Sequence, residues 1–367
     1  MALCTVPRSS LFTTPLRRRS VLKAALAALG TSALGGLSGC GGAEGGALNL
    51  FTWASYVPDD VLNDFMDSEK IDVTSSTFDS NEDMLSKYKS GSEGMYDLIN
   101  PTGYMVARMI QEDLLHKIDT SKLKNYGNLN TAFLDLGYDP GNTYSVPYLA
   151  SATAIAYNSD VWKGDDIPKS WEDLLDPKYA DSIAVIDNSL ELGAVFADIV
   201  GTEFDEEDGS HEAEYRELAE KIKPNIALFD GDCITPLVNG DATLAIVYTA
   251  STALAQNDNP AIDVSFPSEG INLAIDNWVI PHDAQNVDNA LKLIDYILEA
   301  DVAASISETY PYVQPNEAAL EKLGSDFLDN PSKNVPADVI EGAHYYTQPI
   351  STDVTAMMED IWSSLKQ

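Results

Sequence analysis

The chain has 367 residues, with 58 Asp and Glu against 22 Lys and Arg and a formal net charge of −36 at pH 7. This balance argues against a nucleic-acid partner, because phosphate binding depends on Lys and Arg. It favours attraction of a cation, although solubility accounts for most of the carboxylates. A chain of this length is too long for one ordinary core and predicts two lobes.

The first 39 residues have the pattern of an export signal. Arg17 and Arg18 precede a short apolar stretch, Ala24 to Leu37, which glycine dilutes and which is too short for a membrane span. The arginine pair resembles a twin-arginine signal, and Leu37-Ser38-Gly39-Cys40 looks like a bacterial lipobox. An organelle transit peptide is the weaker alternative. We therefore expect residues 1–39 to be removed, and Cys40 to be lipidated and to anchor an exported protein to a membrane.

Cysteine and histidine usage predicts no disulfide and no metal site. Of the three cysteines, Cys4 leaves with the signal and Cys40 is the anchor, so Cys233 stands alone. We expect Cys233 to pack as a small buried hydrophobe. The four histidines are scattered without paired spacing, and we expect no metal and no cofactor.

The first part of the mature chain alternates between predicted strands and helices. A Gly-rich segment, residues 40–47, is expected to act as a flexible tether. The alternation that follows favours an α/β lobe with a largely parallel sheet. Strands are expected at Leu48–Phe51, Ile71–Phe78 and Leu98–Ile99, and helices at Asp59–Phe65, from Asn81 to about Lys89 and at Tyr104–Glu112.

A second lobe is expected to open after Tyr148. Ser170 to Asp173 has a capping pattern that predicts the start of a helix. The remaining helices are expected from apolar residues at helical spacing. Strands are expected at Ala152–Tyr157, Ile183–Ile186 and Thr243–Tyr248, and helices at Glu212–Lys223, Val287–Leu298 and Val354–Leu365.

Enzyme signatures are missing from the sequence. It contains no GxSxG, HExxH, phosphate-loop or GxGxxG motif. Ser363-Ser364-Leu365-Lys366 matches SxxK, but the partner motifs of that chemistry are lacking, so chance explains the match. The acidic run Asp205 to Gly209 has its glycine one place early for a calcium loop, which indicates a solvated acidic loop.

Aromatic and polar side chains follow several predicted strands, at the end where open α/β sheets bind ligands. Asp276 adds a carboxylate inside an otherwise apolar run. Aromatic faces and carboxylates suit an alkyl ammonium ion, whereas an anion would need the Lys and Arg that these segments lack. The sequence therefore predicts a cleft for a cationic ligand. The residues after the strands are Trp53, Ser55, Tyr56, Thr102, Tyr104, Asn188, Glu191, Tyr248 and Ser251.

Several longer motifs carry a family resemblance that covers nearly all of the mature chain. They are Phe51-Thr52-Trp53-Ala54-Ser55-Tyr56-Val57-Pro58, Ser80-Asn81-Glu82, Tyr96-Asp97-Leu98, Lys117-Ile118-Asp119, Tyr144-Ser145-Val146-Pro147-Tyr148 and Tyr312-Val313-Gln314-Pro315-Asn316. With these motifs the chain resembles the spermidine/putrescine-binding proteins, the substrate-binding subunits of bacterial polyamine ABC importers.

The resemblance implies an α/β fold of the two-lobed type II periplasmic-binding-protein class, with a hinged interdomain cleft. Lobe 1 would comprise residues 48–150 and 273–320, and lobe 2 residues 151–272 and 321–367. The chain would thus cross between the lobes near 150, 273 and 320. Closure would trap a polyamine and present it to permease subunits in the membrane. The resemblance also implies a monomer without enzymatic activity.

The resemblance assigns a role to each site residue. Trp53 and Tyr56 match an aromatic pair, and Thr102 and Tyr104 match a Ser-x-Tyr motif. The others are two ligand-binding carboxylates, Glu191 and Asp276, then Tyr248 in place of a stacking Trp, Tyr312 as a stacking Tyr and Gln348 as a C-terminal glutamine.

Three positions depart from the family pattern. Ser55 stands where a spermidine binder has Glu, Asn188 where it has Asp, and Ala274 where it has an aromatic residue. Two carboxylates remain, which favours a dication such as putrescine over the trication spermidine. The alternatives are thiamine or another amine, ferric iron held by paired tyrosines, and an exported enzyme built on the same lobes.

Overall fold

The computed structural model describes residues 44–91 and 93–367. The predicted export signal and Cys40 lie outside the described residues. Part of the predicted tether is already bonded to the folded body, because Gly45 N donates to Lys70 O at 2.7 Å and the first strand begins at Ala47. Within the described residues, no helix combines the length and the apolar character that crossing a bilayer requires.

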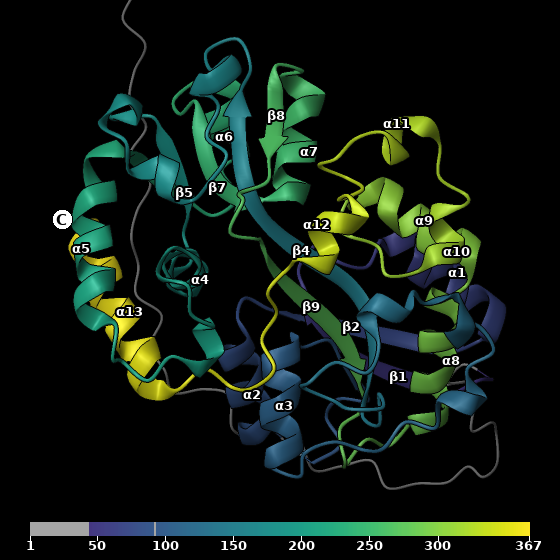
Figure 1. Cartoon of the computed structure of the whole chain (residues 1–367). Helices are drawn as coiled ribbons and strands as arrows, with labels where there is room; N and C mark the ends of the chain where they lie inside the picture. Colours follow the sequence, from purple (N-terminus) through teal and green to yellow (C-terminus); the bar gives the residue numbers. More distant parts are fainter. Residues whose placement is uncertain (1–43, 92) are drawn as a thin grey trace, which may run out of the picture. The chain divides into compact units, whose positions relative to one another are not determined.

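The strands form one mixed sheet, flanked by helices (Figure 1). The strands are β1 (Ala47–Trp53), β2 (Asp72–Phe78), β3 (Leu98–Ile99), β4 (Ser145–Asn158), β5 (Ile183–Ile186), β6 (Ile226–Asp230), β7 (Leu244–Tyr248), β8 (Ile262–Ser265) and β9 (Asn272–Val279). The α-helices are α1 (Asp59–Glu69), α2 (Asn81–Ser90), α3 (Gly103–Gln111), α4 (Ser189–Val200), α5 (Glu212–Ile222), α6 (Ile234–Asn239), α7 (Thr249–Asp258), α8 (Val287–Ile297), α9 (Ala300–Thr309), α10 (Glu317–Leu320), α11 (Ser325–Leu328), α12 (Ala337–Glu341) and α13 (Thr352–Leu365).

The order of the strands is β2-β1-β3-β9-β4-β7-β5-β6, and β8 pairs with β4 outside this path. The pairs at both ends are parallel, as the strand–helix alternation predicts. The middle of the sheet is antiparallel, because β9 pairs with β3 and β4, and β4 pairs with β7 and β8. The expectation of a largely parallel sheet is therefore correct only for the outer strands.

Strand β4 connects the two halves of the sheet (Figure 1). Residues 145–153 pair with β9, while residues 153–157 pair with β7. Every residue of β4 is buried or half-buried, which matches its nearly continuous run of apolar and small residues. Pro147, which has no N–H to donate, lies at the irregularity of the β4–β9 ladder.

The buried hydrophobic residues form separate cores on the two sides of this crossing. One core joins β5 and β7 to α4, α5 and α13, and α5 and α13 lie side by side in Figure 1. Two others cover the β1–β3–β9 side. Val335 packs in one of these, although the sequence places residues 321–367 in lobe 2. The exact lobe boundaries stay a prediction.

The helix expected to begin at Ser170–Asp173 is reduced to a single 3₁₀ turn, Glu172–Leu175. The capping pattern itself is present, since Asp173 N donates to Ser170 Oγ at 3.0 Å and Ser170 N donates to Asp173 Oδ2 at 3.1 Å. Pro177 forces extended backbone on the residue before it and stops the helix from continuing.

A side chain added at Gly193 of α4 would collide with the core. An added Cβ would lie 2.5 Å from Cζ of Phe204, whose ring is buried. We expect Gly193→Ala to lower the free energy of unfolding by ~1–2 kcal/mol, because overpacking outweighs the better helix propensity of Ala. Urea unfolding measures this change. In Gly231→Ala, the control, the new Cβ meets nothing within 4 Å. Equal stability of Gly193→Ala and the wild type would contradict the packing of α4.

Candidate functional site

The carboxylate of Asp276 lies in the middle of β9 and is bound by two hydroxyl groups from the first half of the chain. Tyr56 Oη donates to Asp276 Oδ2 at 2.5 Å, and Thr102 Oγ1 donates to Asp276 Oδ1 at 2.6 Å. Tyr56 lies between β1 and α1, and Thr102 is the N-cap residue of α3. Two strand-end loops therefore converge on one carboxylate of β9.

Asn81, the first residue of α2, ties the second of these loops together. Its Nδ2 donates to Thr102 Oγ1 at 3.0 Å and to Tyr104 Oη at 3.1 Å, and its Oδ1 accepts from Thr102 N. Tyr104 Oη in turn donates to Glu82 Oε1 at 3.1 Å. The side chains of Asn81, Thr102 and Tyr104 thus hold one another in place beside Asp276.

Aromatic rings surround this carboxylate. The ring of Tyr56 packs edge-to-face against Tyr312 and Tyr148, at centroid distances of 5.0 and 5.4 Å. Trp53 packs edge-on against Phe78 at 4.5 Å. The buried indole N–H of Trp53 lies close enough to Asp276 to favour the ionised carboxylate. These rings present apolar faces and one N–H donor next to Asp276.

The second carboxylate, Glu191, is held by one side chain from each of three neighbouring strands. Thr153 Oγ1 donates to Oε2 at 2.6 Å, Asn272 Nδ2 to Oε2 at 3.1 Å and Tyr248 Oη to Oε1 at 3.3 Å. Thr153 is the register partner of both Asn272 and Tyr248. The row across β9, β4 and β7 therefore fixes the Glu191 side chain at the start of α4.

Asp276, Ala274 and Asn272 occupy alternate positions of β9 and so lie on one face of the sheet. Ser151 of β4 is the register partner of Ala274. Ala274 is the one residue of β9 that is half-buried rather than buried. Ser151 is likewise half-buried between buried neighbours in β4. Two small residues thus separate the Asp276 end of this face from the Asn272 end, where Glu191 is bound.

Both carboxylates are buried, with exposed fractions of 6% each. Burial raises the pKa of Asp276 to about 6, although O–H donation by Thr102 and Tyr56 favours the ionised form and the negative charge of Glu191 disfavours it. Burial also raises the pKa of Glu191. Among residues 44–91 and 93–367, no Lys, Arg or His forms an ion pair with either carboxylate. The site therefore carries negative charge that the described residues do not neutralise.

The structure brings together most of the residues expected from sequence. Burial raises the pKa of Tyr248, and the neighbouring amide of Asn188 acts in the opposite direction. The Asn188 side chain also caps α4 by accepting from Leu190 N at 3.0 Å. The residues brought together around the two carboxylates are Trp53, Tyr56, Thr102, Tyr104, Asn188, Glu191, Tyr248, Asp276 and Tyr312.

Three predicted site residues do not join this network. Ser55 is exposed and has a left-handed backbone, with φ of 52°. Gln348 is also exposed, and its contact is a backbone bond from its N to Asp205 Oδ2 at 3.1 Å. Ser251 is buried on α7, and its hydroxyl makes no hydrogen bond with the described residues. Their roles as ligand contacts stay predictions.

Three further residues at the site were not predicted from the sequence: Thr153, Asn272 and Tyr346. Tyr346 Oη accepts from Asn272 Nδ2 at 3.2 Å, which places it beside Glu191, and its ring lies edge-on to Tyr104. Thr153 and Asn272 lie inside strands rather than after them, so the strand-end rule does not select them. Only the register of β4 against β9 reveals their position.

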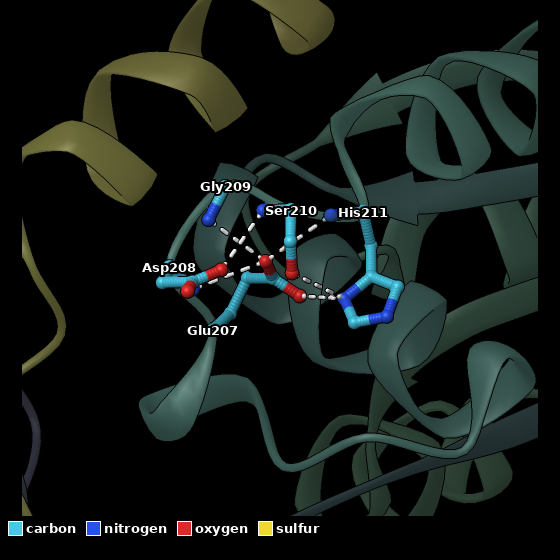
Figure 2. Close-up of polar contacts among 5 residues, drawn as sticks. All are labelled: Glu207, Asp208, Gly209, Ser210 and His211. Carbon is cyan, nitrogen blue, oxygen red and sulfur yellow. Dashed lines mark hydrogen bonds and ion pairs between the residues drawn. The ribbon is translucent and has the colours of Figure 1, made fainter.

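The acidic run Asp205 to Gly209 does not form a metal site. In Figure 2 the side chain of Glu207 is turned inward onto its own loop. Its Oε1 accepts from Gly209 N at 2.8 Å and its Oε2 is 2.8 Å from His211 Nδ1. Within the part of the chain that is described, no group of three or more His, Cys, Asp or Glu side chains could hold a metal ion.

Comparisons with known proteins agree with this architecture. A family model of bacterial extracellular solute-binding proteins matches residues 60–343. The spermidine/putrescine-binding periplasmic protein of Salmonella typhimurium is 36% identical, over 93% of this chain and 97% of its own. A putrescine-binding periplasmic protein of Escherichia coli is 32% identical, over 81% and 85%. These relatives are solute-binding proteins of transport systems and not enzymes.

A solved structure gives the same result for the fold. The spermidine/putrescine ABC transporter substrate-binding protein of Streptococcus pneumoniae superposes with a TM-score of 0.77 at 27% identity, covering 87% of this chain and 98% of that chain. The prediction of a two-lobed α/β fold of the periplasmic-binding-protein class is confirmed.

The raised pKa of Asp276 predicts a specific effect of pH on stability. Its pKa is about 6 in the folded protein against 3.8 for the ordinary group. The folded state therefore prefers the protonated form, and this contribution to stability is complete below pH 3.8 and lost as the pH rises through 6. Asp276→Asn, which stays neutral, should raise the free energy of unfolding of the unliganded protein at pH 8 by ~1–3 kcal/mol.

Urea unfolding at pH 8 and at pH 4 tests this expectation, since the difference between Asp276→Asn and the wild type should shrink towards zero at pH 4. A difference that is independent of pH would show that Asp276 has the same pKa in the folded and unfolded states.

Proposed function

Since this chain belongs to the family of bacterial extracellular solute-binding proteins, we propose that it captures a polyamine between its two halves and delivers it to an ABC import permease. The proposal rests on one observation above all. Two buried carboxylates, Asp276 and Glu191, lie on the strand and helix that meet where the halves join, and no basic side chain of the described residues pairs with them.

A buried ionised carboxylate without a cation is costly, so a ligand that brings positive charge gains the interaction energy that the protein leaves unused. An amine can donate to the second lone pairs of both carboxylates while their hydroxyl and amide partners stay in place. The surrounding tyrosines and Trp53 add cation–π contacts of roughly 0.5–2 kcal/mol each. The site thus favours alkyl ammonium groups.

The arrangement supports a rod with a charge at each end. Ala274 and Ser151 lie between the Asp276 end and the Glu191 end and are half-buried. A methylene chain can cover these small residues while its two ammonium groups reach the carboxylates. We therefore propose a diamine such as putrescine as the preferred ligand, and spermidine as the weaker one.

The departures at two other positions support the same preference. Ser55 is exposed, and Asn188 carries no charge and caps α4, so neither supplies a third carboxylate. The Salmonella relative is named for spermidine and putrescine, and the Escherichia coli relative for putrescine.

Ferric iron is the second cationic ligand to consider, because tyrosines are numerous at the site. Burial and the nearby carboxylates raise the pKa of Tyr56, Tyr104, Tyr248 and Tyr346 well above the ordinary value. These phenols keep their protons, and those of Tyr56, Tyr104 and Tyr248 donate to carboxylates, whereas iron would need phenolates. The protonation states favour an ammonium ligand.

We also propose that the protein is an exported lipoprotein, monomeric, with its export signal in residues 1–39 and its lipid on Cys40. The periplasmic relatives support export, and the lipobox pattern supports the anchor. Mass spectrometry of the protein extracted from membranes tests the anchor, since it should find an acylated Cys40 as the first residue.

Calorimetry with putrescine, cadaverine, spermidine and thiamine tests the ligand. We expect wild-type protein to bind putrescine most tightly. Asp276→Asn and Glu191→Gln should each weaken binding by at least ~100-fold, because a desolvated ammonium loses its charged partner, an effect of roughly 3–5 kcal/mol.

Asp97→Asn is the matched control for removal of a buried carboxylate. Asp97 is fully buried and accepts from Asn49 N and Gln285 N, neither of which belongs to the proposed site. The Asp97→Asn variant should bind putrescine like the wild type, and thermal unfolding checks that each variant is folded. Unchanged putrescine affinity in folded Asp276→Asn would refute the proposed site.

A further inference from the structure

Tyr346 reaches the site from a short segment that is anchored on both sides. We call residues 344–348 the strap. Its first residue pairs with β9, since His344 N donates to Ile271 O at 2.8 Å and Leu273 N donates to His344 O at 2.8 Å. Farther along, Thr347 N and Gln348 N both donate to Asp205 Oδ2, at 2.6 and 3.1 Å. The strap thus lies alongside the strand that carries Asn272 and Asp276.

The side chain of His344 adds a third anchor. His344 Nδ1 is 2.7 Å from Asp198 Oδ1, and Asp198 lies on α4, the helix that carries Glu191 at its other end. Trp171 Nε1 holds the second oxygen of Asp198 at 3.1 Å and also donates to Gly270 O. Trp171 is buried and holds Asp198 from the other side. Loss of the His344–Asp198 interaction should therefore move the strap rather than α4.

We infer that His344 is a positioning residue: its pairing with Asp198 holds the strap so that Tyr346 lies beside Glu191 and Tyr104 and can contact a bound ligand. The inference rests on the proposed function, because it concerns affinity for the same cationic ligand. The His344 side chain bonds to Asp198 and, among the described residues, makes no hydrogen bond to a side chain that binds either carboxylate.

The pairing makes ligand affinity depend on pH on the alkaline side. Asp198 raises the pKa of His344 above its usual 6.5, and the negative charge of Glu203 acts in the same direction. These two are the charged groups that act on His344 among the described residues. Burial raises the pKa of Asp198, although His344 acts in the opposite direction. The charged pair is therefore complete only above the pKa of Asp198, and it is lost on the alkaline side as the pH rises through the pKa of folded His344.

Loss of the positive charge of His344 weakens its bond to Asp198 but does not remove it. A neutral imidazole with its proton on Nδ1 still donates to Asp198, although a charge-assisted bond is roughly twice as strong. We expect affinity for putrescine to fall by about fivefold, the lower end of typical coupling between a remote group and a binding site.

The chain offers a matched control in His211. Its Nδ1 is 2.8 Å from Glu207 Oε2, and both histidine side chains have an exposed fraction of 34% beside a carboxylate that is at most 4% exposed. Figure 2 shows that this second pair closes on its own loop, residues 207–211. His211→Gln therefore removes a His–carboxylate pair of similar geometry and exposure, one that does not include a residue of the strap.

The test is the ratio of putrescine affinities of wild type and His344→Gln, measured by calorimetry from pH 6 to pH 9. Both proteins share the effects of ligand and Asp276 ionisation on affinity, so these effects cancel in the ratio. Glutamine donates to Asp198 without a charge, so the ratio should fall from about five at pH 6 to about one at pH 9. The ratio for His211→Gln should stay near one throughout. A ratio for His344→Gln that does not change with pH would overturn the inference.

Hydrogen exchange on the unliganded protein separates this inference from the proposed function. Protection factors of the amides of residues 344–348 should fall with rising pH in the wild type and stay constant in His344→Gln. If no amine binds the wild type at any pH, the proposed function fails, while the exchange data still decide whether His344 holds the strap. Equal protection in both proteins at every pH would overturn the inference.

Discussion

Two negative charges buried at the centre of a mixed sheet, with no basic partner in the described part of the chain, determine how this protein is built. Asp276 and Glu191 are each held by hydroxyl and amide donors instead of by cations. Such donors keep a carboxylate oriented and leave its charge largely uncompensated. The large hydrophobic cores on either side of β4 stabilise the fold and offset the free energy that burying these charges costs. Function and stability are thus opposed at this site.

The crossing strands make the arrangement possible. Because β4 pairs with β9 along its first part and with β7 along its last part, residues of either half can meet on one face. The loops after β1 and β3 bring hydroxyl donors to Asp276. Helix α4 carries Glu191, and β7 contributes Tyr248, which donates to it. The strap then places Tyr346 over the second carboxylate from the C-terminal part of the chain. Five distant segments share one small region because β4 runs through both halves of the sheet.

The sequence predicted which residues form the site better than it predicted which of them contact one another. Strand-end positions identified Trp53, Tyr56, Thr102 and Tyr248, because ligand sites of open sheets form where strands end. Local patterns cannot give the pairing of β4 with β9, since register between strands more than 100 residues apart depends on the folded core. Tyr346 and the row of donors around Glu191 were therefore missed. The helix expected at residue 170 failed for a local reason, the proline that follows its capping turn.

Proton release on ligand binding shows directly whether a diamine binds against the ionised carboxylate of Asp276. Calorimetry of putrescine binding at pH 6, in two buffers of different ionisation enthalpy, counts the protons exchanged. Because the pKa of Asp276 is about 6, that group is about half protonated before binding and ionised beside an ammonium. We predict that Asp276 releases about half a proton per diamine at pH 6, that any protonated Glu191 adds to this release, and that the release decreases strongly by pH 8. Tight binding without any proton release at pH 6 would contradict this prediction.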